Sequence, residues 1–395
     1  MRRLLDSSYD AAVRDNLLPF TLTRIAANTC YRFAPPFIAI IAGNAQGFDV
    51  SITRVGLVIS ISELAGFLAP LLGTFVDRVS RRISTATGLF GSFIGIMMMA
   101  AAPNLVVLCV GLTLLNLLKS CFDLGMAAWI SDRVPYAQRG RVVGITETSW
   151  ALSLLLGVSA LGLITAATSW RIACALGGVA IAVCAFWLDH RIRVSGEVVA
   201  EPNTPLLVAG PAITRAWLVP VSMFGLMGGS QCLFVTFGAW LADDFNFGAS
   251  GIAAVGFALG AGELLSSISS AKLTDRLGKE RSVALGAALM MPSALVLAGF
   301  DSVLLIGLLA LAIFIVGFEY AVVSMLPIAT NLFAGAPGKG FGLVIGAGTF
   351  GRGVLTFIAT LLYEQFGVSG ASLAAIACAA LSATAILLFN RGTNS

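Results

Sequence analysis

The stretches "VGLVISISEL" (55–64) and "VGFALGAGEL" (255–264) align at an offset of 200 residues, with Val, Gly, Glu and Leu in the same register. Each stretch places one carboxylate, Glu63 or Glu263, inside an apolar run. Other residues keep the same offset: Phe37 and Phe237, Ala39 and Ala239, Ala42 and Ala242, Gly140 and Gly340, and the aromatic pair Trp150 and Phe350. Several matches in one register indicate an internal repeat, so the chain is predicted to consist of two similar halves.

The composition places these halves in a membrane. Of the 395 residues, 58% are hydrophobic and only 11% are charged, whereas soluble domains carry about 25% charged residues. The mean hydropathy is +0.93. The apolar runs are about 20 residues long, which suits transmembrane helices, whereas barrel strands are shorter and alternate in polarity. The predicted fold class is therefore an all-α polytopic membrane protein.

Twelve transmembrane helices are predicted, in two pseudo-symmetric six-helix halves. The spans lie near 19–43, 52–76, 83–102, 104–130, 142–166, 170–189, 216–241, 250–273, 282–300, 302–331, 340–363 and 367–390. The organisation expected from them is a cytoplasmic N-terminal segment (1–18), an N-terminal half (19–189), a cytoplasmic linker (190–215), a C-terminal half (216–390) and a cytoplasmic tail (391–395). Parallel repeats related by an axis along the membrane normal are a known transporter plan.

The distribution of basic residues predicts the orientation. With the N-terminus inside, eighteen of the 24 Lys and Arg residues fall in inner segments, and Arg54 and Arg171 alone fall in outer loops. Because cytoplasmic loops of membrane proteins are enriched in Lys and Arg, both termini are predicted to be cytoplasmic.

Three short loops carry a recognisable charge pattern. They read "GTFVDRVSRR" (73–82), "SDRVPYAQRGR" (131–141) and "AKLTDRLGKER" (271–281). The first and third resemble the signature G-x-x-x-D-R-x-G-R-R of the major facilitator superfamily. The second resembles the D-x-x-P-x-x-x-R-G motif of its drug/proton antiporter branch. The residues that match are Gly73, Asp77, Arg78, Arg81, Arg82, Asp132, Arg139, Asp275 and Arg276.

The resemblance implies both a gating role and a transport mode. By motif match, Asp77, Arg78, Asp132 and Arg139 would form cytoplasmic charge contacts that hold the two halves in one state. The alternative is that these residues are ordinary positive-inside anchors. The antiporter branch implies export, but its Gly-Pro-x-x-Gly-Gly signature in the fifth span is not kept in "GVSALG" (157–162).

Charged residues within the spans are the candidate site, because charge in lipid is costly and faces a cavity or a partner. The candidates for substrate or proton binding are the bases Arg32, Lys119 and Arg352 and the acids Glu63, Asp123, Glu263 and Glu319. If each base pairs with one acid, one carboxylate remains, and such a group can bind and release a proton. The alternative is a static structural network.

Sequence spacing suggests partners for several of these charges. Lys119 and Asp123 are spaced i, i+4, so they share a helix face and can pair. Lys119 aligns with Glu319 in the repeat, which puts opposite charges at equivalent sites. Glu63 and Glu263 are expected either to titrate or to pair with Arg32 or Arg352.

Two further expectations concern position. The resemblance implies that spans one, four, seven and ten line a central cavity, so that Arg32, Lys119, Asp123 and Glu319 face it. Glu147 lies about one and a half turns inside its span, and is expected to reach the cytoplasmic surface or Arg139 and Arg141.

The sequence therefore predicts a secondary active transporter in the cell membrane that exports a small molecule in exchange for protons. The alternatives are proton-coupled uptake of a small, possibly anionic metabolite and a non-transporting membrane receptor. An enzyme is not expected, because no catalytic constellation is present. No cofactor or metal site is expected either, since the seven cysteines show no ligand spacing. The expected partners are the substrate, protons and membrane lipids, without nucleic acid, and the chain is expected to be a monomer.

Overall fold

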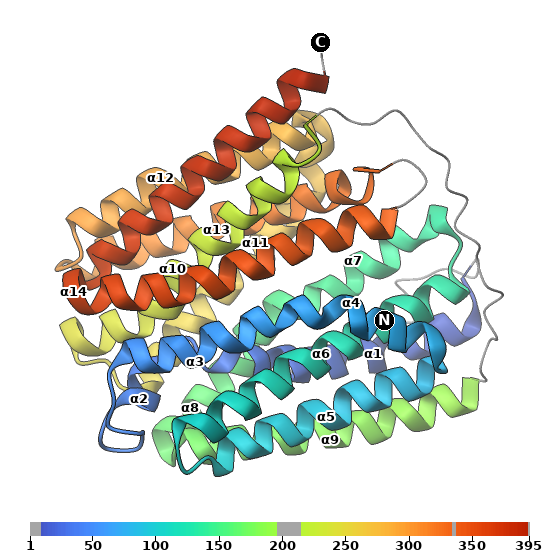
Figure 1. The fold of residues 1–395 in the computed structure, drawn as a ribbon, viewed down its shortest axis with the longest axis horizontal. Coiled ribbons are helices and arrows are strands. Elements are labelled where there is room, and N and C mark those ends of the chain that lie inside the picture. The colour runs from blue at the N-terminus through green and yellow to red at the C-terminus, as the bar shows by residue number, and fades with distance from the viewer. Residues whose placement is uncertain (1–8, 196–214, 334–336, 394–395) are drawn as a thin grey trace. The chain divides into compact units, whose positions relative to one another are not determined.

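The computed structural model describes residues 9–195, 215–333 and 337–393, and over these residues it contains helices and no strand. The all-α fold class predicted from the sequence is thus confirmed (Figure 1). The helices are α1 (Ala11–Phe33), α2 (Ile38–Ala42), α3 (Ile52–Leu64), α4 (Ala69–Arg78), α5 (Arg81–Ala101), α6 (Leu105–Arg133), α7 (Tyr136–Leu152), α8 (Ser159–Ala167), α9 (Trp170–Ser195), α10 (Leu218–Phe245), α11 (Ala249–Leu277), α12 (Lys279–Gly299), α13 (Leu304–Thr330) and α14 (Pro337–Thr393).

Most of these helices are suited to cross a membrane. Within the described ranges, nine helices are long and apolar enough, or ten if α3 and α4 are counted as one broken span. The 57-residue α14 covers two predicted spans. The helix α1 is not among the nine, because it carries Arg24, Arg32 and several buried Asn and Thr side chains. With α1 and both parts of α14 included, each predicted span has its helix.

The ends of the helices follow from local sequence. Asn104 caps α6 by accepting hydrogen bonds from the backbone N–H groups of Val106 and Val107 at 3.1 and 3.0 Å. The helix α1 stops just before Pro35, which cannot donate to a helical ladder. Gly367 has a φ of 64° inside α14, a conformation that glycine adopts at low cost. The chain turns there, so α14 consists of two helices joined at a kink, as the two predicted spans require.

Two predicted spans are interrupted near their centres. In the second span, a 3₁₀ turn at Ala65–Leu68 separates α3 from α4, and it begins two residues after Glu63. In the fifth span, a π-helical segment at Ser153–Val158 lies between α7 and α8. Single π turns inside α-helices occur frequently at functional sites. The sequence predicted both spans as uninterrupted helices.

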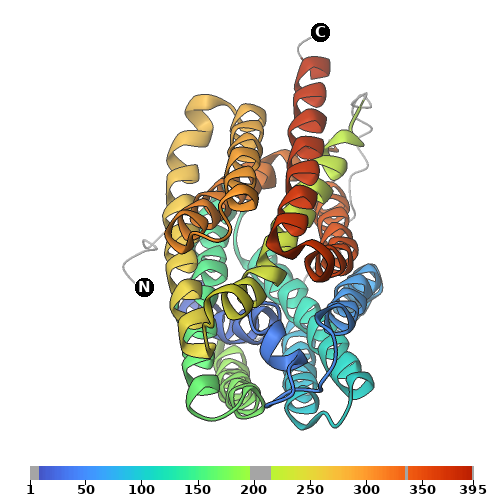
Figure 2. The same ribbon diagram turned by 90° about the vertical axis from the view of Figure 1, so that its left-hand side faces the viewer.

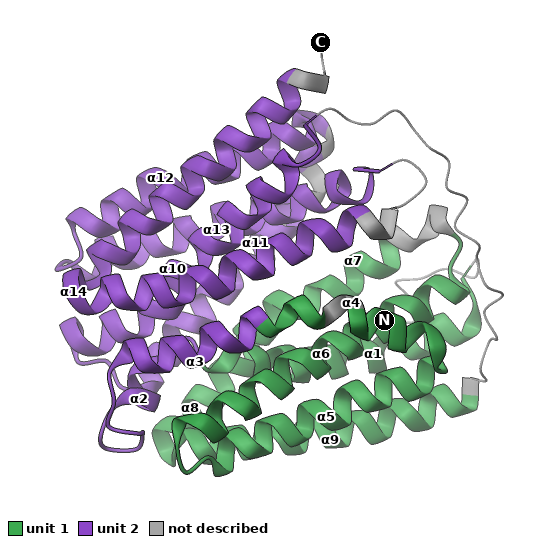
Figure 3. Ribbon diagram, viewed as in Figure 1, with its two compact units in different colours: residues 1–34, 65–203 green, residues 35–64, 204–395 purple. Residues whose placement is uncertain are grey.

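The described helices form two compact units (Figure 3). The first unit consists of Met1–Ala34 and Ala65–Asn203, and the second of Pro35–Leu64 and Thr204–Ser395. The helix α3 therefore packs in the second unit, against α14, although it precedes α4 to α9 in the chain.

Close helix contacts in each unit depend on glycine. In the first unit, α5 lies beside both α6 and α9 (Figure 1). At the α5–α6 contact, a Cβ on Gly95 would stand 2.5 Å from the backbone nitrogen of Leu115. In the second unit, α14 follows α10 closely, and the two views in Figures 1 and 2 show how it doubles back at Gly367. Small residues let membrane helices approach closely in this way.

The α5–α6 contact gives the first prediction. Gly95→Leu should destabilise the protein, because overfilling a packed contact costs about 1–3 kcal/mol. Gly342→Leu is the matched control, since a Cβ on Gly342 meets nothing within 4 Å. The thermal unfolding midpoint of the purified protein in detergent measures both. Equal midpoints for the two variants would contradict the assigned contact.

Candidate functional site

The seven candidate residues divide between the two units. Arg32, Lys119 and Asp123 lie in the first unit, whereas Glu63, Glu263, Glu319 and Arg352 lie in the second. Six of the seven are buried, with exposed fractions of 7% or less, and Asp123 is partly buried. Each unit therefore has its own set of charges at membrane depth.

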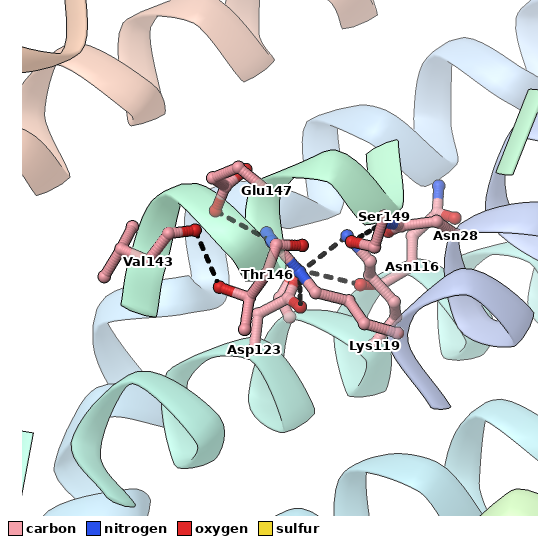
Figure 4. A network of polar contacts seen from close by, with 10 residues as sticks. Asn28, Asn116, Lys119, Asp123, Val143, Thr146, Glu147 and Ser149 are labelled. Carbon is pink, nitrogen blue, oxygen red and sulfur yellow. Dashed lines mark hydrogen bonds and ion pairs between the residues drawn. The ribbon is translucent and has the colours of Figure 1, made fainter. Parts of the chain in front are cut away.

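In the first unit, an ionic network joins α1, α6 and α7. Lys119 Nζ lies 2.7 Å from Asp123 Oδ2, as the i, i+4 spacing predicts. The other carboxylate oxygen of Asp123 accepts a hydrogen bond from Arg24 Nε at 3.1 Å. Arg24 Nη1 also donates to Glu147 Oε1 at 2.7 Å and to the carbonyl of Thr146 at 3.1 Å. Figure 4 shows the side chains of Lys119, Asp123 and Glu147 converging there.

Glu147 has a partner that the sequence did not suggest. Its carboxylate pairs with Arg24, and its side chain is 43% exposed. The cause of this pairing is that Arg24 extends from α1 towards α7 and supplies a basic partner inside the unit. The expected approach to the cytoplasmic surface or to Arg139 and Arg141 stays a prediction, because the side chain of Arg139 lies outside the described residues. Asn28, one turn further along α1, donates to the hydroxyl of Ser149 at 3.3 Å.

Two of the candidate cations in this unit, Arg32 and Lys119, lie over aromatic rings. The guanidinium of Arg32 lies 4.4 Å from the ring centroid of Trp150, and its Nη1 donates to the Trp150 carbonyl at 2.9 Å. Lys119 Nζ lies 5.0 Å from the ring centroid of Tyr31 and 5.7 Å from that of Trp150. Such contacts stabilise a cation by about 0.5–2 kcal/mol, more where water is excluded. The positive charges of Arg32 and Lys119 thus lie against the aromatic rings of Tyr31 and Trp150.

The π-helical segment is hydrogen-bonded to Trp150, one of these two aromatic residues. The hydroxyl of Ser153, its first residue, donates to the Trp150 carbonyl at 2.6 Å. A Cβ on Gly157 would overlap the side chain of Thr29 on α1. The fifth span thus follows α1 closely at the place where the antiporter signature would lie.

In the second unit, Glu63 and Arg352 form a buried ion pair. Arg352 Nη2 lies 3.1 Å from Glu63 Oε1, with side-chain exposures of 8% and 4%. Of the two partners that the sequence left open for Glu63, the structure selects Arg352. The hydroxyl of Ser60, one turn earlier on α3, donates to the carbonyl of Gly353 at 2.6 Å.

The contact between α3 and α14 continues from this pair towards the start of α3. Gly56 meets Thr360 so closely that a Cβ there would overlap the threonine side chain. The backbone N–H of Thr53 donates to Glu364 Oε1 at 2.8 Å. The ion pair is therefore one end of a continuous contact that runs for about three turns.

Glu263 and Glu319 lie on α11 and α13, which are in contact. Glu263 is 1% exposed and Glu319 is 6% exposed. Glu319 Oε1 accepts a hydrogen bond from the hydroxyl of Ser267 at 2.6 Å. Both carboxylates are thus enclosed by protein.

Several residues of the loop motifs form contacts within the first unit. Arg81 Nε lies 2.8 Å from Asp132 Oδ2, and its Nη1 lies 3.9 Å from the Asp77 carboxylate. The Asp77 side chain is 78% exposed. Arg82 pairs with Asp189 on α9 at 2.6 Å. Arg81 and Arg82 therefore join the end of α4 and the start of α5 to α6 and α9.

Three further motif residues lie at helix ends, where the described side chains show no contact that would act as a latch. Gly73, Arg78 and Arg276 lie at or near the ends of α4 and α11, and the two arginines are exposed. The side chains of Arg139 and Asp275, and most of the predicted linker, lie outside the described residues.

Sequence reasoning missed three contributors to the site. Arg24 was not among the candidates, yet Arg24, Asn28 and Arg32 are spaced i, i+4, i+8, which is a polar face of α1. Trp150 and Tyr31 gave no signal as partners of cations. The alignment of Trp150 with Phe350 did mark an aromatic position shared by both halves.

The ionic network of the first unit gives a prediction about stability. Arg24→Gln should cost about 3 kcal/mol, because it leaves the Asp123 carboxylate with less compensation inside the unit. The double variant Arg24→Gln/Asp123→Asn should cost less than the sum of the two single variants. Thermal unfolding of the purified variants measures both.

Arg193→Gln provides the control for this cycle. Arg193 pairs with Asp189 at 3.1 Å but its side chain is 62% exposed, and such pairs contribute less than about 1 kcal/mol. Strict additivity in the Arg24–Asp123 cycle would show that the two residues do not interact.

Comparison with known proteins agrees with this arrangement of helices. The profile of the Major Facilitator Superfamily matches residues 21–360. A protein of Bacillus subtilis (strain 168), named Uncharacterized MFS-type transporter YwfA, is 28% identical over 265 residues, and the chain spans 61% of that relative's length.

Two solved structures share the fold. Both are crystal structures of a bacterial homolog to the human lysosomal transporter Spinster in an inward-facing conformation, one unoccupied and one occupied. The unoccupied structure has a TM-score of 0.76 at 13% identity, and the alignment covers 98% of each chain. The occupied one has a TM-score of 0.72 at 12% identity, covering 97% of this chain and 96% of the other. At these identities the similarity shows the fold alone.

Proposed function

The chain belongs to the major facilitator superfamily, and on that premise we propose that this transporter exports a small molecule from the cell in exchange for protons. It acts as a monomer in the cell membrane with both termini in the cytoplasm, as the distribution of Lys and Arg indicates. The observation that carries the proposal is the burial of Glu63, Glu263 and Glu319 at membrane depth. Ionisable groups are costly there, and they are typical of ion and proton pathways.

The division of charge between the units supports separate sites for substrate and proton. In the first unit, Arg24, Arg32 and Lys119 accompany Asp123 and Glu147. In the second unit, three buried carboxylates accompany Arg352. We therefore assign substrate binding to Arg32, Lys119 and the rings of Tyr31 and Trp150, and proton binding to the second unit.

Proton-coupled uptake of an anionic metabolite is the second candidate. Arg32 and Lys119 over aromatic rings form a surface suited to a carboxylate or phosphate attached to an apolar body. The fifth span also lacks the proline of the antiporter signature, with Val158 in its place.

Inverted membrane vesicles with an acidic interior separate the two candidates. A ligand-stabilisation screen of cations, anions and neutral metabolites on purified protein first identifies a test compound. Export by exchange predicts that this compound accumulates inside the vesicles while the interior pH rises. Movement of compound and protons in the same direction would support uptake instead. Binding without any movement would contradict transport.

Alternating access also requires the α3–α14 contact to open, and Glu63→Gln tests this requirement. Loss of the ion pair should weaken the closed contact, so that a cysteine at Thr360, which is fully buried beside Gly56, becomes more accessible. We expect labelling of Thr360→Cys by an impermeant maleimide from outside to rise at least about fivefold in the Glu63→Gln background. Unchanged labelling of Thr360→Cys would show that the Glu63–Arg352 ion pair does not control the opening of this contact.

Asp77→Asn should act in the opposite direction. If Asp77 belongs to a contact that keeps the cytoplasmic side closed, its loss favours the state in which the outer side is closed. Labelling of Thr360→Cys should then fall in the Asp77→Asn background. Glu280→Gln, a change of charge in the first turn of α12, is the control. Equal labelling of Thr360→Cys in the Asp77→Asn and Glu280→Gln backgrounds would show that Asp77 has no gating role.

A further inference from the structure

A polar stripe follows one face of α11 along its contact with α13. Its members are Glu263, Ser266, Ser267, Ser270 and Thr274, spaced three or four residues apart, as one helix face requires. Ser267 donates to Glu319 at 2.6 Å, and Ser266 donates to the carbonyl of Val316 at 2.8 Å. All but the half-buried Ser267 are buried.

The stripe ends in a closed ring of three hydroxyls. Thr274 Oγ1 lies 2.7 Å from Ser324 Oγ on α13, and Ser270 Oγ lies 3.1 Å from Ser324 Oγ and 3.0 Å from Thr274 Oγ1. Each hydroxyl can donate or accept. The hydrogen bonds of the ring can therefore reverse direction without movement of the heavier atoms.

The ring lies between Glu319 and the end of α11. Ser267, which holds Glu319, precedes Ser270 by about 4.5 Å along the helix axis. Thr274 is in the last turn of α11, which ends at Leu277, and the exposed Arg276 follows it. The stripe thus extends from a buried carboxylate to the end of its helix.

The shared fold does not require these hydroxyls. At the 200-residue offset, Ser267, Ser270 and Ser324 align with Phe67, Pro70 and Leu124. The equivalent contact in the first unit, between α4 and α6, forms without them. Hydroxyls between membrane helices also contribute little to stability, about 0.6 kcal/mol each. Thr274 has a counterpart in Thr74, so a role in proton movement is needed to explain only Ser267, Ser270 and Ser324, which have none.

From this geometry we infer that Glu319 takes up the coupling proton, and that the ring of Ser270, Thr274 and Ser324 passes it between Glu319 and the end of α11. A proton enters at Thr274 and passes through Ser324 and Ser270 to Ser267, and each hydroxyl accepts one proton while releasing its own. Ser267 then gives its proton to Glu319 across their 2.6 Å hydrogen bond, which forms the O–H bond of a neutral Glu319. No hydroxyl changes its charge overall. This assignment rests on the proposed proton-coupled function and names its carrier.

Other charged and titratable groups lie on α13 and on the helices that contact it. Those with described side chains are Glu263 and Arg276 on α11, Cys232, Asp243 and Asp244 on α10, Tyr320 on α13, Arg352, Tyr363, Glu364, Cys378 and Arg391 on α14, and Lys279, Glu280 and Arg281 in the first turn of α12. Arg352 is paired with Glu63, and Tyr320 donates to Ser282 at 3.4 Å. Glu263 is the other buried carboxylate beside the polar stripe and could also take up the proton, so the test must distinguish it from Glu319.

Infrared difference spectroscopy of the full chain in lipid nanodiscs tests the inference without any substrate. A pH jump should produce the carbonyl band of a protonated carboxylic acid. The band should persist in Glu263→Gln and Glu319→Asp, disappear in Glu319→Gln and shift in frequency in Ser267→Ala. A full band in Glu319→Gln, or an unshifted band in Ser267→Ala, would overturn the assignment to Glu319.

The rate at which the band appears tests the ring. Ser324→Ala and Ser270→Ala should slow it by roughly a hundredfold, the lower end of the effect of a positioned proton-transfer group. Ser222→Ala is the matched control, because Ser222 and Ser382 form a buried hydroxyl pair at 2.9 Å between α10 and α14. It should leave the rate within about twofold.

The outcomes separate this inference from the proposed function. Wild-type rates in Ser324→Ala, or equal slowing in Ser222→Ala, would show that the hydroxyls only hold helices together. If Ser324→Ala fails to fold, Ser270→Ala and the hydroxyl-retaining Ser324→Thr carry the comparison. If Glu319 takes up a proton in the spectra but the protein moves no protons in vesicles, the proposed transport function is wrong and the assignment of the proton to Glu319 still holds.

Discussion

A charged side chain inside a membrane must find its compensation within the protein, because no bulk water is available there. The buried parts of this chain are arranged around that constraint. Arg24 reaches both Asp123 and Glu147, and Lys119 completes the set. Removing one member leaves the other buried charges uncompensated. This lowers the free energy of unfolding far more than replacing the whole network by apolar side chains would.

Among the described residues of the second unit, the same constraint involves the Glu63–Arg352 ion pair and several hydroxyl groups. Arg352 compensates Glu63, whereas Glu319 is held by the hydroxyl of Ser267. A fixed cation keeps a carboxylate charged, while a hydroxyl can bond to either the charged or the neutral form. The repeat has thus diverged from Lys119 in one half to Glu319 in the other, and we attribute substrate binding and proton binding to this divergence.

Much of the fold was predictable from local patterns. Apolar runs of membrane length gave the spans, and the repeat placed Glu63 and Glu263 at matched positions. The i, i+4 spacing gave the Lys119–Asp123 pair. The Glu63–Arg352 pair joins residues 289 positions apart, so spacing could name candidates but not choose between them.

The interruptions in the spans were not predictable in the same way. The π segment at Ser153–Val158 depends on how Gly157 meets Thr29 of α1, and that is a property of packing rather than of helix propensity. The partner of Glu147 was missed for a similar reason, since Arg24 comes from a helix more than a hundred residues away. Local sequence patterns do not reveal contacts between residues that lie this far apart in the chain.

The central claim is that the contact between α3 and α14 opens and closes during each transport cycle. The double variant Thr53→Cys/Glu364→Cys tests it most directly, because the backbone N–H of Thr53 on α3 contacts the Glu364 side chain on α14 at 2.8 Å and neither residue is buried. The account predicts that oxidation to a disulfide stops transport of the test compound in proteoliposomes and that a reductant restores it, while each single variant is insensitive to oxidant. Undiminished transport by the fully cross-linked protein would contradict the account.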